Sequence, residues 1–272
     1  MAENYLHRED APFADEVWEK IDEAAVGAAK TQLTGRRVLY TEGPYGPALK
    51  SLPLQDHVVE EASDQEGVSV RGACVLPVAR IEAEFTVPIR DIAAFEEDGK
   101  PLDVGPVAGA AVSCARQEDA LIFNGSDALK TTGLMNADGT QSVKLGTWEE
   151  AGEAAENLIS AVTTLDEAGY HGPYTLALSP ARYNKLFRRY RQGNATEMQH
   201  VEQLITDGIV KAPSIEKGGV LLASGKSYAS IVLGQDLSVG FIGPAGGDYE
   251  FVLTESLALW LKSPSAVCLL ED

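Results

Sequence analysis

The first regular pattern of apolar and polar residues lies between Ala14 and Leu33 and predicts a helix. Acidic residues at its start suit the positive end of a helix dipole, and Gly35 is expected to end it as a C′ residue. One face carries a broad stripe of apolar residues that is rich in alanine: Phe13, Val17, Ile21, Ala24 and Ala28, flanked by Trp18, Ala25, Ala29 and Leu33. This face either packs on the chain's own core or forms a docking groove for another chain.

Similar periodicity predicts several more helices. Residues 106–124 follow a proline that suits a first helical turn, and Gly125 is expected to stop them. The strongest pattern starts at Thr147-Trp148-Glu149-Glu150, which has the spacing of a capping box, and ends at Gly169. Shorter helices are expected over residues 90–96, from Pro180 onward and over 197–206.

Alternating and continuous apolar runs predict strands over residues 81–89, 174–178 and most of 209–270. Between residues 46 and 80 there is no helical period. An extended run and a second alternating run flank a polar stretch that includes Gly67, which predicts a two-stranded arm. Because an isolated hairpin is marginally stable in water, the arm needs support from its own body or from a neighbouring subunit.

Composition excludes several classes of protein. The apolar content of 44% allows a large core, and no segment has the length of a membrane span or the pattern of a signal peptide. Three widely spaced cysteines indicate neither a disulfide framework nor a zinc site, so we expect a soluble, cytoplasmic protein. The formal charge of −19 disfavours nucleic acid as a partner, because such binding depends on Lys and Arg.

Motifs for catalysis, cofactors or metals are missing from the sequence. The four histidines lie apart from one another, and no hydrolase, zinc-protease or dinucleotide motif occurs. Residues 219–227 approach a phosphate-binding loop, but five residues separate the glycines, and Gly225 is expected to turn a hairpin. Asp236, between apolar runs, is predicted to be a turn or capping carboxylate. We therefore predict no catalytic residue, no metal ligand and no cofactor.

Four segments spread over nearly the whole chain carry a more specific pattern. They are KTQLTGRR (30–37) with EGPYG (42–46), GPYTL (172–176), LGQDLSVGF (233–241) and PSAVCLL (264–270). In this order they resemble segments of the encapsulin shell proteins, in particular the shorter, first class of linocin-like encapsulins. That family has the Hong Kong 97-like phage capsid fold and assembles into icosahedral compartments around cargo enzymes.

The resemblance implies an α+β chain with a P-domain, an A-domain and an extended E-loop. Residues 1–45 would hold the N-terminal helix and part of the P-domain, and residues 46–80 the E-loop, which crosses to a neighbour. The P-domain would continue over 81–146, with the spine helix, and over 234–262, with strands. The A-domain would hold residues 147–233, and a C-terminal strand over 263–272 would return to it.

Two interaction sites are also implied by the resemblance. A C-terminal targeting peptide of the cargo would dock in a groove lined by Ala25, Ala29, Leu33, Leu39, Leu237 and Val239, although such residues can equally belong to the core. A loop at the fivefold axis would line a pore with Arg191, Gln192, Gly193, Asn194 and Ala195. The cargo would be a ferritin-like iron-storage protein or a dye-decolourising peroxidase, which links the shell to iron storage and oxidative stress.

Two other classes of protein remain open at this point. A phage major capsid protein would share the fold, and a bacteriocin-like peptidase is a label that the family has carried. Some encapsulins stack a flavin on a Trp after a Thr-Leu-Asp-Leu segment, but here Thr86-Val87-Pro88-Ile89 leads to Arg90. We therefore expect no flavin at that position. The shell itself would be a homo-oligomer with a multiple of sixty subunits.

Overall fold

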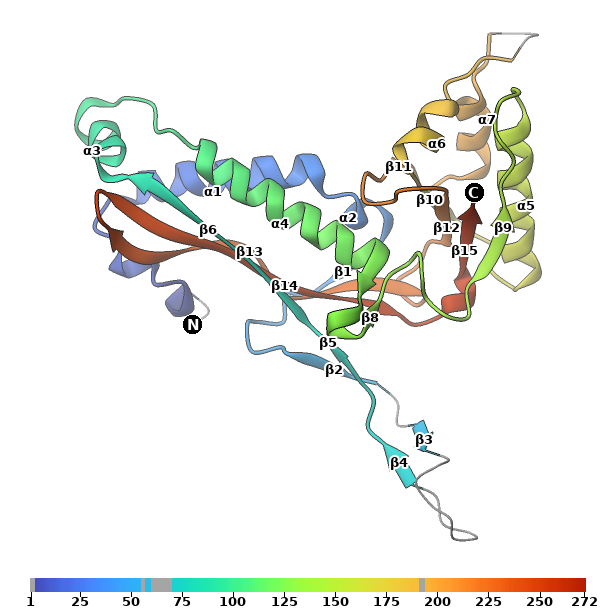
Figure 1. Cartoon of the computed structure of the whole chain (residues 1–272), viewed down its shortest axis with the longest axis horizontal. Helices are drawn as coiled ribbons and strands as arrows, with labels where there is room; N and C mark the ends of the chain where they lie inside the picture. Colours follow the sequence, from blue (N-terminus) through green and yellow to red (C-terminus); the bar gives the residue numbers. More distant parts are fainter. Residues whose placement is uncertain (1–2, 55–56, 60–69, 191–193) are drawn as a thin grey trace.

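The computed structural model describes the chain except for residues 1–2, 55–56, 60–69 and 191–193. Helices and strands combine into two sheets with separate hydrophobic cores, and a narrow arm projects away from both (Figure 1). One sheet has four strands in the order β1-β13-β14-β6, and the other has five in the order β11-β10-β12-β15-β9.

The four-stranded sheet is built on a long antiparallel hairpin of β13 (Ala229–Ala245) and β14 (Asp248–Leu261). Strand β6 (Ala79–Pro88) pairs antiparallel with β14, and β1 (Tyr40–Glu42) pairs parallel with β13. Helices α1 (Asp15–Gln32) and α4 (Gly105–Asn124) run side by side along this sheet (Figure 1). The larger core lies between these helices and the sheet, and it extends to residues of the five-stranded sheet such as Ala177, Val220 and Val267.

The five-stranded sheet contains β9 (Gln141–Lys144), β10 (Tyr174–Leu178), β11 (Ile209–Lys211), β12 (Gly219–Ala223) and β15 (Val267–Glu271). Every residue of β10 and β12 is buried, as expected for central strands with both faces covered. Helices α5 (Glu153–Glu167) and α6 (Pro180–Lys185) pack against strands of this sheet, and α7 (Glu197–Leu204) packs against α5. It therefore has a core of its own.

The arm consists of two short antiparallel pairs. Its base joins β2 (Ser51–Pro53) to β5 (Val75–Pro77), and farther out β3 (His57–Val59) pairs with β4 (Val70–Gly72). Figure 1 shows this arm extending beyond both sheets. The remaining elements are η1 (Glu3–Leu6), η2 (Arg8–Asp10), α2 (Gly35–Val38), α3 (Ile89–Asp98), β7 (Gly125–Ser126), η4 (Asp127–Leu129), β8 (Thr131–Thr132) and η5 (Pro264–Ala266).

Gly35 does not end the first helix as a left-handed C′ residue, so that prediction is wrong. It instead begins α2, and its backbone N–H donates to Asp119 Oδ1 at 2.8 Å. A Cβ at this position would lie 2.6 Å from Ile122 Cδ1 on α4. A side chain here would therefore have to displace the end of the Ile122 side chain, and glycine lets α2 lie close to the spine helix α4.

The predicted capping box at Thr147 is also wrong. Helix α5 begins at Glu153 after Gly152, and Trp148 has a positive φ of 57°. The Glu153 carboxylate instead accepts a hydrogen bond from the Glu149 backbone N–H at 2.8 Å, and so holds a turn that precedes the helix. A complete capping box occurs at α7, between Thr196 and Gln199.

Gly225 does not turn a hairpin. The strands before and after it belong to different sheets, because β12 pairs with β10 and β15, whereas β13 pairs with β1 and β14. Gly225 therefore lies in a connection between the two sheets. Strand β9 already belongs to the five-stranded sheet, and β13 begins at Ala229 in the four-stranded sheet. The chain therefore passes from one sheet to the other before residue 147, and back again before residue 233.

Candidate interaction surfaces

The structure places most of the predicted docking residues inside the larger core. Five of them are at most 9% exposed: Ala25, Ala29, Leu33, Leu39 and Val239. Leu237 is half-buried and packs against the same core. The small side chains of α1 face α4, whose contact surface includes the buried Ala111 and Cys114. These residues pack α1 against the core of its own chain.

The outer side of α1 is exposed to solvent at several positions. Val26 is 42% exposed, and Gly27 and Lys30 are also exposed. A Cβ placed on Gly27 would meet nothing within 4 Å, so the surface there is open. The apolar stripe that the sequence predicts therefore lies on the buried side of the helix.

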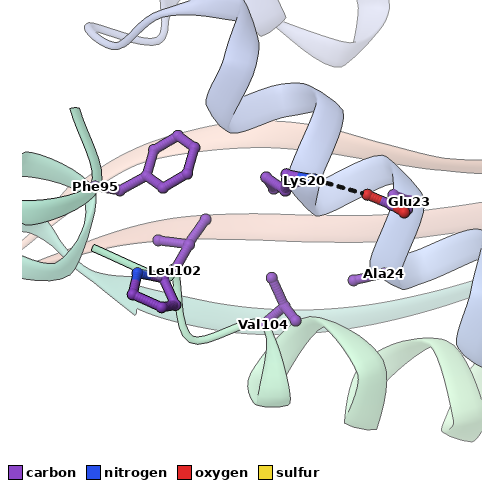
Figure 2. A pocket seen from close by; sticks show the side chains of 7 residues that line it. Lys20, Glu23, Ala24, Phe95, Leu102 and Val104 are labelled. Atoms are coloured by element: carbon purple, nitrogen blue, oxygen red, sulfur yellow. Dashed lines mark hydrogen bonds and ion pairs between the residues drawn. The ribbon is translucent and has the colours of Figure 1, made fainter. Parts of the chain in front are cut away.

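A small apolar pocket of about 320 Å³ adjoins this side of α1 (Figure 2). Figure 2 shows Ala24 of α1 on one side of this pocket and Phe95 of α3 on the other, with Leu102 and Val104 from the segment before α4 between them. Lys20 and Glu23 form an ion pair of 3.0 Å beside it. This pocket could not be predicted from the sequence, because its walls come from segments that are about 80 residues apart. The apolar residues around the turn at residue 99 were the available signal.

The predicted pore loop lies between α6 and α7. Arg191, Gln192 and Gly193 lie outside the described residues, whereas Asn194 is exposed and Ala195 is half-buried. The ends of the loop are held together, because the Tyr190 N–H donates to the Ala195 carbonyl at 3.2 Å. The next residue, Thr196, is the N-cap of α7. The described residues on the two sides of residues 191–193 are thus paired with each other, at Tyr190–Ala195 and at Arg189–Thr196.

A buried ionic cluster joins the short helix α2 to the spine helix and the sheet. Arg36 donates two hydrogen bonds to Glu118, at 2.8 and 2.7 Å, and contacts Asp236 at 2.8 Å and Glu255 at 3.1 Å. Glu118 and Glu255 are at most 1% exposed. Asp236 is about half exposed, and its carboxylate also accepts the Leu237 N–H, so it acts as a turn and ion-pair residue.

One arginine cannot neutralise three carboxylates. Burial disfavours the charged form of Glu255, and the negative charge of Glu118 adds to this, so that the pKa of Glu255 is raised to about 9. Burial alone would lower the pKa of Arg36, but its hydrogen bonds to Glu118 and Asp236 outweigh that effect and raise it. At neutral pH Glu255 is therefore a neutral acid, and the cluster is a structural one.

Metal-ligand side chains and thiols can be located in the part of the chain that the structure describes. Among the described residues, no three His, Cys, Asp or Glu side chains are grouped so that they could hold a metal ion. Cys114 and Cys268 are buried thiols, and burial raises the pKa of each to about 12. In the parts of the chain that the structure covers, no helix is long and apolar enough to cross a membrane.

Comparison of the whole fold with solved structures defines the class of protein. A virus-like particle from Pyrococcus furiosus matches with a TM-score of 0.73 and 23% identity, over 94% of this chain and 100% of that one. The capsid of Myoviridae phage XM1 matches with a TM-score of 0.61 and 14% identity, over 85% and 88% of the two chains. The chain thus has the α+β, Hong Kong 97-like capsid fold.

Sequence comparison identifies the family within that class. Residues 3–258 match the family described as "Encapsulating protein for peroxidase" (Linocin_M18). A type 1 encapsulin shell protein of Myxococcus xanthus is 32% identical over 279 residues, which cover 98% of this chain and 96% of that protein. The chain belongs to this encapsulin family. It is a structural shell protein of an icosahedral nanocompartment and not an enzyme, so the peptidase and phage capsid alternatives are set aside.

Proposed function

We propose that the shell encloses a cargo enzyme of oxidative metabolism, either a dye-decolourising peroxidase or a ferritin-like iron-storage protein. The description of the family as an encapsulating protein for peroxidase supports this. Such a cargo would carry a C-terminal targeting peptide. Because one oligomeric cargo presents several peptides to many identical subunits, each contact can be weak and loading can still be efficient.

The docking surface that we propose for this peptide follows α1 and the β13 segment around Leu237. The observation that carries the proposal is the open, small-residue side of α1 next to the apolar pocket at Ala24. An extended peptide needs a shallow groove with room for a few apolar side chains. Ala25, Ala29, Leu33, Leu39 and Val239 would fix the shape of this surface from beneath, and Leu237 would contribute directly.

Two substitutions to arginine on α1 test this proposal. Val26→Arg places a large cation on the exposed side, so we expect normal shells that leave co-expressed cargo outside. Ala29→Arg places the same cation at a 2% exposed position, so we expect loss of folded shells, because an unpaired buried charge is costly. Cargo content is measured from purified particles by gel electrophoresis and electron microscopy. If Val26→Arg shells are fully loaded with cargo, then α1 is not part of the docking surface.

We also propose that residues 191–195 line the opening at the fivefold axis. The loop is polar in sequence, and its described end is solvent-exposed, as a channel lining requires. The shell would act in the cytoplasm, with a multiple of sixty copies of this chain. It would contain no nucleic acid, because a chain with a formal charge of −19 repels phosphate backbones.

A further inference from the structure

An apolar pocket of about 240 Å³ lies between α5 and α7, beside the five-stranded sheet. Ile159 of α5 is 53% exposed there, so the chain on its own leaves apolar surface uncovered. The volume is below the roughly 300–1,000 Å³ of small-molecule sites and suits a single inserted side chain. The lining consists of Ala155, Ile159, His200, Val201, Gln203 and Leu204.

An aromatic side chain that could fill such a pocket is exposed elsewhere on the same chain. Phe187, just after α6, is 56% exposed, whereas its neighbour Leu186 is fully buried in the smaller core. Tyr183 packs edge-on against the Phe187 ring, with ring centroids 5.7 Å apart. Phe187 is therefore held at the surface and fills no gap in its own core. Aromatic side chains are typical anchors of protein–protein contacts, because each buries a large apolar area.

The pocket and Phe187 lie at different ends of the five-stranded sheet. Helix α6 contacts β10 and β11 at one end, and α5 contacts β15 and β9 at the other. Figure 1 shows α6 near β11 and α5 beside β9. A contact between Phe187 of one copy and the pocket of another would thus join two different surfaces. Such heterologous contacts can close into rings, and an icosahedral shell contains rings of five.

The charges around the two surfaces are opposite. Residues 180–190 contain no acidic residue and four basic ones, Arg182, Lys185, Arg188 and Arg189. The first three pair with Asp272 or Glu149 of the same chain, and Arg189 is exposed two residues after Phe187.

The helices that form the pocket are acidic. Residues 145–181, which include α5, contain no Lys or Arg, and neither does α7. Glu156 is exposed one helical turn from Ile159, at the edge of the pocket. Copies with a formal charge of −19 repel one another, so a contact that places a basic segment against an acidic helix pair is favoured.

We propose that Phe187 of one copy inserts into the α5–α7 pocket of the neighbouring copy, and that Arg189 then faces Glu156 of that neighbour. The proposal rests on the shell-forming function and does not involve the cargo. The inserted ring would cover Ile159 and remove apolar surface from water on both copies. The ion pair at the edge would fix the direction of the contact, because two copies of either surface would bring like charges together.

Removal of the aromatic ring tests the apolar part of this contact. Phe187→Ala should lower the fraction of assembled shells at least about tenfold, because the loss is repeated at every copy of the contact. Leu129→Ala shortens another exposed apolar side chain, on η4, and is the matched control. It should assemble like the parent.

Charge reversal with rescue tests the polar part. Arg189→Glu and Glu156→Arg each bring like charges together, so each should weaken the contact roughly twofold to fivefold, as expected for an exposed ion pair. The variant with both substitutions should regain assembly. Glu167→Arg is the control, because it makes the same change at an exposed position about 16 Å farther along α5.

Assembly of the full chain is measured by size-exclusion chromatography and electron microscopy, and folding by circular dichroism. If Phe187→Ala does not fold, Arg189→Cys/Glu156→Cys shells are treated with a short bis-maleimide. They should form a series of linked copies that neither single-cysteine variant forms.

Three results would overturn the proposal. They are folded Phe187→Ala chains that assemble like the parent, a doubly reversed variant that assembles no better than either single one, and a double-cysteine variant that links no more copies than the single ones. Shell formation by the parent chain is measured alongside, so failure of this contact leaves the shell function intact.

Discussion

The neutral Glu255 makes a quantitative prediction about alkaline stability. Its pKa is raised from an ordinary value of 4.5 to about 9 by burial and by the nearby Glu118. Between these two values the folded chain retains a proton that the unfolded chain has lost. The free energy of unfolding should therefore fall as pH rises through this window, by about 1.4 kcal/mol for each pH unit, and the loss ends above pH 9.

Glu255→Gln should remove this loss. Glutamine has the shape of the protonated acid, can accept from Arg36 and can donate to Glu118, but it does not ionise. For a chain of this size, 1.4 kcal/mol corresponds to roughly 3–5 °C in melting temperature. From pH 6 to pH 8 the melting temperature of the parent should therefore fall several degrees more than that of Glu255→Gln. Burial also raises the pKa of Asp119, but this residue is the same in both chains, so it does not contribute to the difference between them.

The assay is differential scanning fluorimetry of intact shells at constant ionic strength from pH 6 to pH 9. Glu250→Gln removes a carboxylate from a half-buried position of the same strand and is the matched control. Its pH profile should follow that of the parent. If Glu255→Gln and the parent show parallel profiles, then Glu255 is ionised in the folded chain and the account of the cluster is wrong.

Three further predictions concern helix capping, the pore and the flavin position. Thr196→Ala should cost about 1 kcal/mol and lower the melting temperature by a few degrees, because it removes the capping box of α7; Thr163→Ala on the exposed side of α5 is the control. Arg191→Glu shells should admit small cations faster than parent shells in a stopped-flow dye assay, and equal rates would exclude control by this loop. Purified shells should show no flavin absorbance, and density stacked beside Arg90 would contradict this.

The sequence predicted the long helices and the fold class better than it predicted local contacts. Periodicity located both ends of α1 and of α4 to within one residue, because the apolar faces of these helices cover a sheet. The four motif segments pointed to the capsid fold, and the comparisons confirm it. Residue spacing alone could not show that β12 and β13 belong to different sheets, since both are apolar runs on either side of a glycine turn.

The candidate sites were harder to predict, for a physical reason. A small apolar residue on a helix suits a core and a docking groove equally well, so Ala25 and Ala29 could not be assigned before their burial was known. Thr147 and Thr196 both precede an acid or amide at the capping distance. Only Thr196 caps a helix. After Thr147 the chain forms a turn, in which the Glu149 N–H donates to the Glu153 carboxylate.

The projection of the arm affects how the chain tolerates change. Its described strand pairs, β2 with β5 and β3 with β4, extend beyond both sheets (Figure 1). Neither hydrophobic core includes a residue of these four strands. Substitutions in these strands should therefore lower the stability of a single copy much less than substitutions in either core.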